Sequence, residues 1–234
     1  MSKKKLIVNA DDFGQSPGIN SGIIKAHEQG IVTSASLMVR YPAAAAAADY
    51  ARNNNKLGIG LHIDLGEWIF VEGDWKPLYE VVSINNIKAV EYEITQQLNS
   101  FYKLMGRNPT HIDSHQHVHK REYLRPVFLE LAGNLNIPLR HYSEQVMYCG
   151  SFYGQLENSS PFHEAIFVNA LKNIISGLAV GITELACHPG LIDDIRTMYR
   201  IERGIEVDTL CDPSIRQAIA DNHIELCNFK DINI

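Results

Sequence analysis

The sequence lacks the features that would direct a protein to nucleic acid, to a membrane or out of the cell. Its 234 residues carry 21 Lys and Arg against 27 Asp and Glu, a formal charge of −6, with no basic block, so nucleic acid and anionic membranes are poor partners. No stretch approaches the roughly 18 apolar residues of a membrane helix. The apolar run 6–8 is far too short for the core of a signal peptide. We therefore expect a cytoplasmic protein that binds neither nucleic acid nor membrane.

The sequence also has few cysteines and no nucleotide-binding fingerprint. Its four cysteines are widely spaced and include no C-x-x-C pair, so neither a disulfide framework nor a thiolate zinc site is indicated. The glycines at 18 and 22 are not followed by Gly-Lys-Ser/Thr, so they do not form a P-loop. What remains is a composition with 45% hydrophobic and 21% charged residues, which is ordinary for a globular enzyme.

Short apolar runs alternate with helical patterns along the whole chain. We predict strands at 6–9, 31–39, 57–63, 110–114, 138–142, 182–187 and 224–229, with irregular stretches at 64–86 and 143–162. Strands that alternate with helices indicate parallel βαβ units, and therefore either a doubly wound sheet or a barrel. We favour an α/β fold in the form of an irregular parallel β/α barrel of about seven strands. No linker divides the chain, so 1–234 is expected to be a single domain.

Acidic residues and histidines gather where the predicted strands end. The candidates are Asn9, Asp11 and Asp12 after the first strand, His62 and Asp64 at the third, His111 to His119 at the fourth and His188 at the sixth. In both architectures the active site lies at the carboxyl ends of the strands. Four segments therefore deliver metal-binding or acid/base side chains to one end of the sheet.

The segment HIDSHQHVH at 111–119 carries the strongest signal. In an extended chain, residues two apart share a face, so His111, Asp113, His115, His117 and His119 would line one side. So many ionisable groups cannot form a dry core without a large desolvation cost. The alternative is a solvated edge strand in which the histidines cluster by chance. A divalent metal site explains the pattern better, although the chain can turn after His115 and take His117 and His119 away from it.

The adjacent pair Asp11 and Asp12 indicates a division of labour. Neighbouring residues at a strand end point in different directions, so one carboxylate would hold a metal and the other would take a proton from water. The alternative is an ordinary Asp-Gly turn. His62 and His188, taken singly, are equally compatible with structural hydrogen bonding, although Pro189-Gly190 would turn the chain at His188.

Several other residues support weaker hypotheses. Trp68 belongs to an aromatic-rich stretch, 68–79, that would form either a sugar-stacking wall or a satellite hydrophobic cluster. Arg203 lies among acidic residues that include Asp193 and Asp194, and would either orient a carboxylate or substrate or form a surface ion pair. We also consider His117 a candidate for binding or orienting substrate.

The strand-end motifs resemble those of a known family. They read Asn9-Ala10-Asp11-Asp12-Phe13-Gly14, Gly60-Leu61-His62, Thr110-His111-Ile112-Asp113-Ser114-His115-Gln116-His117-Val118-His119 and Cys187-His188-Pro189. In this order they resemble the YdjC-like carbohydrate deacetylase family, which includes chitooligosaccharide deacetylases. The resemblance runs from residue 6 to the C-terminus.

The resemblance implies a fold, a cofactor and residue roles. It implies a barrel-like fold related to the polysaccharide deacetylases, and a homodimer that acts on N-acetylated sugars. One divalent metal ion, Mg²⁺ or Zn²⁺, would be held by Asp12, His62 and His115. Asp11 matches the catalytic base of the family, and His188 takes the place of a general acid. The expected reaction is hydrolysis of the acetamide to acetate and an amino sugar.

Two rival functions remain open from the sequence. One is a binuclear metal phosphoesterase or amidohydrolase, for which His117, Asp64 and Asp113 would supply a second metal site. The other is a non-catalytic regulator that binds a sugar or a metal. A pure binding protein would have no use for the Asp11 and Asp12 pair, which favours an enzyme.

Overall fold

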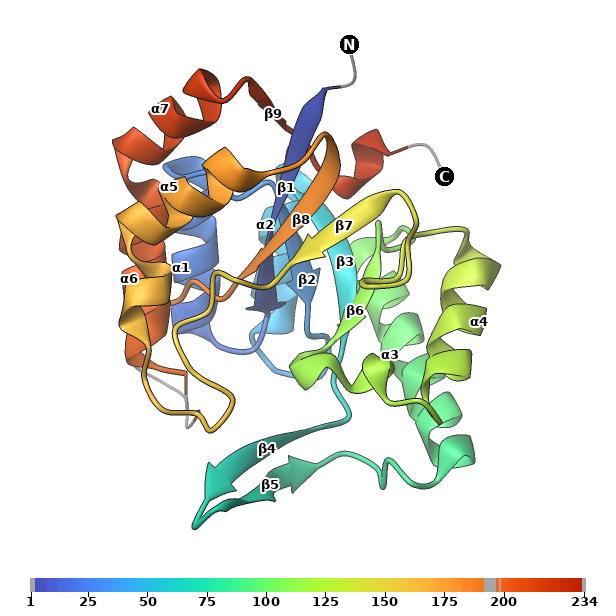
Figure 1. The fold of residues 1–234 in the computed structure, drawn as a ribbon. Helices are drawn as coiled ribbons and strands as arrows, with labels where there is room; N and C mark the ends of the chain where they lie inside the picture. Colours follow the sequence, from blue (N-terminus) through green and yellow to red (C-terminus); the bar gives the residue numbers. More distant parts are fainter. Residues whose placement is uncertain (1–2, 192–196, 198, 233–234) are drawn as a thin grey trace.

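The computed structural model describes residues 3–191, 197 and 199–232, and their main element is a curled parallel sheet (Figure 1). Seven strands form this sheet within the described residues, in the order β6-β3-β2-β1-β8-β7, with β9 against β1. They are β1 (Lys4–Phe13), β2 (Ser34–Leu37), β3 (Gly58–Ile63), β6 (Ile112–Ser114), β7 (Val146–Cys149), β8 (Gly181–Cys187) and β9 (Ile224–Leu226). The outermost strands β6 and β7 are not paired with each other in the described part. The sheet is therefore an open, irregular parallel barrel, as predicted.

Strand β1 is the centre of the sheet and is covered on both faces. Every residue from Leu6 to Phe13 is buried, as expected for a strand of a parallel sheet with helices outside. Along one edge β1 pairs with β8 from Lys4 to Ala10. Its other pairings are with β9 at its start and with β2 at its end. The strand therefore carries its last residues into the interior of the molecule rather than to its surface.

The helices pack around the outside of the sheet (Figure 1). They are α1 (Pro17–Glu28), α2 (Ala44–Asn53), α3 (Ile87–Met105), α4 (Arg125–Leu135), α5 (Val168–Gly177), α6 (Ile201–Cys211) and α7 (Pro213–Asp221). Local sequence signals set several ends. Ser16 caps α1 by accepting the Ile19 N–H at 3.1 Å, and Gly106 ends α3 in the left-handed region at φ 67°. Helix α6 was not predicted from the sequence.

Three predicted segments differ in the structure. The expected strand at 138–142 forms only a single bridge, Ile112 to Leu139, because His141 turns the chain at φ 70°. Strand β7 comes instead from the stretch expected to be irregular. The irregular stretch 64–86 forms an antiparallel hairpin of β4 (Gly66–Val71) and β5 (Asp74–Glu80). This hairpin projects from the carboxyl end of the sheet (Figure 1).

Helix α1 packs closely on the loop that follows β8, and glycines make this possible. A Cβ added at Gly22 would lie 2.4 Å from the Gly190 Cα, so the two backbones are in contact. The loop is held there by the Leu191 N–H, which donates to the Gly18 carbonyl at 3.0 Å. This contact fixes the residues that follow His188.

We expect Gly22→Ala to destabilise the protein by about 1–3 kcal/mol, because the methyl group has only backbone to displace. Gly133 in α4 is the matched control, since a Cβ there meets nothing within 4 Å. Gly133→Ala should stabilise the fold by about 0.5–1 kcal/mol through helix propensity alone. Urea unfolding of both variants tests the prediction. A stabilising Gly22→Ala would show that the close approach does not exist in solution.

Candidate active site

The end of β1 brings two adjacent aspartates to one cavity. The pairing of β1 with β2 shifts register between Ala10 and Phe13, and Asp12 has φ 67°. A bulge with a non-glycine residue in the left-handed region is a strained arrangement typical of functional sites. Asp11 and Asp12 are both buried and both line the cavity, yet they contact different partners. The two carboxylates therefore have different surroundings within one cavity.

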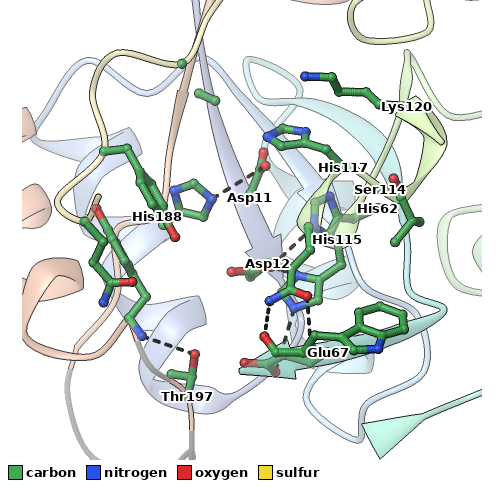
Figure 2. A pocket seen from close by; sticks show the side chains of 18 of the residues that line it. Asp11, Asp12, His62, Glu67, Ser114, His115, His117, Lys120, His188 and Thr197 are labelled. Carbon is green, nitrogen blue, oxygen red and sulfur yellow. Dashed lines mark hydrogen bonds and ion pairs between the residues drawn. The ribbon is translucent and has the colours of Figure 1, made fainter. Parts of the chain in front are cut away.

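Asp12 lies between two imidazoles from two other strands. Its Oδ1 is 3.3 Å from His62 Nε2 and 3.1 Å from His115 Nδ1. His62 is the second-last residue of β3, and His115 directly follows β6. One ligand atom from each of the three residues lies within 4.8 Å of the other two. Figure 2 shows Asp12 facing His115, with His62 behind. The structure thus brings together the three residues that the resemblance implies as metal ligands.

A carboxylate behind His62 indicates that these residues suit a divalent cation. Asp113 Oδ1 is 2.6 Å from His62 Nδ1, the arrangement that orients metal-binding imidazoles in proteins. If Nδ1 donates to Asp113, the lone pair of a neutral Nε2 faces the Asp12 carboxylate. A cation between them, or a proton on His62, removes this repulsion. Although burial opposes the charge, Asp113 raises the pKa of His62 to about 9.

Arg203 holds the other oxygen of Asp12. Its Nη2 donates to Asp12 Oδ2 at 2.6 Å, and its Nη1 donates to the His188 carbonyl at 3.3 Å. Burial disfavours the Asp12 carboxylate, but Arg203 and His115 hold the pKa of Asp12 well below its usual value. Arg203 is only 4% exposed, so it orients a carboxylate and is not a surface ion pair. Asp193 and Asp194 lie outside the described residues.

Asp11 is held by a buried arginine and faces His188. Arg140 donates to both of its carboxylate oxygens, at 2.6 and 2.7 Å, and Asn9 Nδ2 donates to Oδ1 at 2.9 Å. The Nε2 of His188 lies 3.8 Å from Asp11 Oδ2, and Figure 2 shows this contact across the cavity from His115. Asp11 is thus fixed in orientation, with the His188 imidazole beside it.

Arg140 is a central residue of the site that the sequence analysis missed. It is 3% exposed and also contacts Asp113 at 2.8 Å and Glu184 at 2.6 Å. Asp11, His62 and Asp113 form another group with metal-ligand spacing, but Arg140 already forms ion pairs with both carboxylates. A metal therefore has little to gain there. The available signal was a lone arginine inside the predicted strand 138–142.

His188 is positioned by its backbone and by two tyrosine rings. Its N–H donates to the Glu206 carboxylate, which also accepts the Tyr199 hydroxyl at 2.5 Å. Its ring lies 5.5 Å from the Tyr153 ring and 5.4 Å from the Tyr199 ring, centre to centre. Burial lowers the pKa of His188 to about 4, so the imidazole is neutral near pH 7.

Alternate residues of 111–119 do not line one strand face beyond Asp113, and the chain turns after His115, the alternative that the sequence left open. Strand β6 ends at Ser114, and a 3₁₀ segment, His115–Lys120, follows with Gln116 at φ 48° and His117 at φ 52°. These left-handed residues turn the chain. His115 consequently faces Asp12, whereas His117 and His119 lie against His141. Periodicity could not reveal this because it assumes an extended backbone.

His111 lies below the site and has a structural role. Its ring stacks on Phe229 at 3.8 Å between centroids, its Nε2 is 3.0 Å from Ser36 Oγ, and it leaves no room for a Cβ at Gly60. Burial lowers the pKa of His111 to about 4. The ring is therefore neutral in the folded protein near pH 7.

The neutral His111 predicts a defined loss of stability in acid. The unfolded pKa is about 6.5, so between pH 6.5 and 4 the unfolded chain binds a proton that the folded chain does not. Stability then falls as the pH falls, by up to about 1.4 kcal/mol per pH unit for this residue. We expect His111→Gln to flatten the slope by that amount. Urea unfolding in chelator tests this, and an unchanged slope between pH 6 and 5 would contradict it.

The site opens into a cavity of about 600 Å³, within the usual range for small-molecule pockets. Trp68 and Trp75 of the β4–β5 hairpin line it, together with Tyr148 and Tyr153. The Gln116 side chain joins the hairpin to the histidine segment by bonding the Trp68 N–H and carbonyl, at 2.9 and 2.8 Å. Trp68 therefore lies at the cavity wall, and it also packs against the hydrophobic core.

The residues considered for a binuclear hydrolase are not brought together. Asp64 pairs with Arg40 at 2.8 Å and accepts the Tyr79 hydroxyl at 3.0 Å. Asp113 is bound by His62 and Arg140. Neither carboxylate contacts His117 among the interactions of the described residues, so this set does not form a second metal site.

Comparison with known proteins assigns the family. The family model described as "YdjC-like protein" matches residues 5–221. The chain belongs to the YdjC-like family. It is 34% identical to a carbohydrate deacetylase of Clostridium beijerinckii, over 97% of this chain and 100% of that protein. It is 31% identical to a chitooligosaccharide deacetylase of Escherichia fergusonii, over 98% and 100%.

Solved structures share the fold of this chain. A crystal structure from Enterococcus faecalis, provisionally described as a cellobiose-phosphate cleavage protein, matches the YdjC-like chain with a TM-score of 0.82 and 29% identity, covering 100% of both chains. A family 4 carbohydrate esterase of Streptomyces lividans matches at 13% identity and a TM-score of 0.56, over 97% and 91% of the two chains. The latter shows a shared fold only. Among the described helices, none combines the length and apolarity needed to span a bilayer.

Proposed function

We propose that this protein is a metal-dependent deacetylase that removes the acetyl group from N-acetylated sugars. The arrangement of Asp11 and Asp12 carries the proposal. Asp12 faces His62 and His115 with metal-ligand spacing, while Asp11 faces His188 in the same cavity. Relatives named as carbohydrate and chitooligosaccharide deacetylases support the acetamide as the reacting group.

The proposed cofactor is one divalent cation, Mg²⁺ or Zn²⁺, held by Asp12, His62 and His115. A carboxylate and two imidazoles leave positions open for water and substrate, as a catalytic site requires. The bound cation supplies Lewis acidity that polarises the acetyl carbonyl and a water molecule. Arg203 and Asp113 keep Asp12 and His62 in place for it, because each donates to or accepts from one of these ligands.

The reaction is hydrolysis of the amide bond. A water oxygen forms a bond to the acetyl carbon, the bond from that carbon to the sugar nitrogen breaks, and acetate and an amino sugar leave. Asp11 accepts the proton of the attacking water. Its orientation is set by the two hydrogen bonds from Arg140. Because both aspartates lie side by side, the base stands next to the residues that hold the cation.

His188 delivers a proton to the departing amine nitrogen. Since its pKa is lowered to about 4, the imidazole carries no spare proton at neutral pH and must first receive one. Asp11 lies 3.8 Å away and has taken the proton from water. The pair can therefore move that proton from the attacking water to the leaving amine, which balances the reaction without an external acid.

The sugar is expected to lie along the aromatic wall of the cavity. Trp68 and Trp75 offer flat apolar faces on the hairpin, which suit the apolar faces of pyranose rings. Arg203 acts through Asp12, and its charge is already satisfied there. We therefore propose Trp68 for substrate contact and Arg203 for orientation of the ligand set, with chitooligosaccharides as the leading substrate class.

Acetate release from N-acetylated mono-, di- and oligosaccharides tests the proposal. Chelator-treated protein should release no acetate, and added Mg²⁺ or Zn²⁺ should restore release from at least one sugar. Asp12→Asn should bind the catalytic cation weakly and stay inactive after metal addition. Release that persists in chelator would refute the metal requirement. No release from any sugar by metal-loaded protein would refute the sugar acetamide as substrate.

A further inference from the structure

A second group of histidines lies next to the proposed active site. His117 and His119 belong to the 3₁₀ segment His115–Lys120, and His141 lies in the turn that precedes β7. One ring nitrogen from each of the three lies within 4.8 Å of the others. The ring centres are 5.2 to 5.8 Å apart. This cluster, the three-histidine cluster, shares no residue with the Asp12 group.

Each imidazole of the cluster has a buried nitrogen that no other protein group satisfies. Within the described residues, His117 Nδ1, His119 Nε2 and His141 Nε2 have no hydrogen-bond partner. His119 is fully buried, so its free nitrogen is not exposed to bulk water. An unsatisfied buried nitrogen costs free energy. Three unsatisfied nitrogens in one cluster indicate that a ligand from outside the protein chain binds to them.

On His117 and His119 the other ring nitrogen already has a hydrogen-bond partner, which leaves the free nitrogens of these two residues as ligands. His119 Nδ1 lies 2.6 Å from Ser114 Oγ, and His117 Nε2 lies 3.3 Å from the Tyr148 hydroxyl. If each of these nitrogens donates to its hydroxyl, the lone pairs of the opposite nitrogens are free for a cation. Such outer partners fix the tautomer and orientation of metal-binding imidazoles.

The backbone is strained where it presents the cluster. His117 has φ 52° and His141 has φ 70°, in the left-handed region that side chains with a Cβ rarely adopt. Both turns point imidazoles at the cavity, which His117 and His141 line together with Asp11 and Asp12. Strain of this kind persists at sites where side-chain direction matters.

We propose that His117, His119 and His141 form a second metal site, which binds Zn²⁺ or a similar borderline transition metal. A set of three imidazoles without a carboxylate suits Zn²⁺, Co²⁺ or Ni²⁺ and is a poor site for Mg²⁺, which prefers oxygen ligands. Three protein ligands leave one position of a tetrahedral ion open. Because two of the histidines line the cavity, that position faces the space where substrate would lie.

Metal counting on tag-free, chelator-stripped protein tests the proposal. Equilibrium dialysis against Zn²⁺ should give two ions per chain for the wild type, and one for Asp12→Asn. His141→Gln should also keep one ion, and the double variant should bind none. His223→Gln, an exposed histidine outside both groups, should bind two. Co²⁺ in Asp12→Asn should show the visible absorption of a tetrahedral site, and His141→Gln should abolish it.

The outcomes separate this inference from the deacetylase proposal, because metal counting does not depend on turnover. If Asp12→Asn binds no Zn²⁺, or if adding His141→Gln to Asp12→Asn leaves its Zn²⁺ count unchanged, the second site does not exist. The Asp12→Asn protein leaves the cluster untouched, so a count of zero for this variant overturns the inference even if His141→Gln folds poorly. Circular dichroism of each variant shows which counts come from folded protein.

Discussion

Replacing Asp11 by asparagine should lower kcat for acetate release by about 10²–10⁴-fold, the usual contribution of a general base. Asparagine keeps the shape of the side chain but cannot accept the proton of the attacking water. Asp11 is not within the Asp12, His62 and His115 group, so the variant should still bind the catalytic cation. The KM for the sugar should change little, because the group that is lost acts on water rather than on the sugar.

The control for Asp11→Asn is the same substitution at an exposed aspartate outside the proposed active site. Asp208 on α6 has a side chain that is 84% exposed, and Asp208→Asn should leave kcat within about twofold, since exposed substitutions rarely matter. Metal content by dialysis and the urea midpoint show whether the site of Asp11→Asn is intact. A variant that binds metal, is folded and retains wild-type kcat would remove Asp11 from the role of base.

Replacing Arg140 by methionine should destabilise the protein by about 3–5 kcal/mol, the cost of leaving a buried ionic partner uncompensated. The guanidinium is fully buried and contacts Asp11, Asp113 and Glu184. Methionine fills part of the volume of the arginine side chain. It leaves the three buried carboxyl groups without the cation that they share in the described structure. The destabilisation should shrink as the pH falls, because protonation relieves the uncompensated charge.

Urea unfolding at pH 7.5 and at pH 5 measures this effect. Arg125→Met is the matched control, since Arg125 is exposed at the start of α4, and it should change stability by less than about 0.5 kcal/mol. A loss below about 1 kcal/mol for Arg140→Met would show that the three carboxyl groups do not depend on it. Arg140→Lys should recover part of the stability but not the two-pronged contact with Asp11.

The two proposed metal sites differ in how much of their geometry can be predicted from the sequence. Asp12 and His62 lie near the carboxyl ends of β1 and β3, two parallel strands on either side of β2, so strand-end position alone places them at the same edge of the sheet. The three-histidine cluster depends instead on left-handed residues at Gln116, His117 and His141. A periodic pattern does not predict left-handed backbone at residues other than glycine. The pattern at 111–119 therefore predicts a single strand face.

The sequence by itself determined the alternation of the central strands β1, β2, β3 and β8 with helices, and the edge of the sheet where the candidate site residues gather. Apolar runs of the length of β1, β3 and β8 bury themselves, and parallel strands bring their carboxyl ends to one edge. Asp11, Asp12, His62 and His188 therefore had to lie near each other. Family motifs added which carboxylate would hold the cation, a choice that strand position leaves open.

Only the tertiary structure decided which charged groups share a partner. Arg140 binds Asp11, Asp113 and Glu184 from three different strands, and such convergence depends on the strand order and not on local spacing. The same holds for β7, which replaces the expected strand at 138–142 because His141 turns the chain away. Local patterns specify elements one at a time. The cost of desolvating a buried charge is compensated by partners that lie far apart in the chain. Only the folded molecule therefore shows which residues provide this compensation.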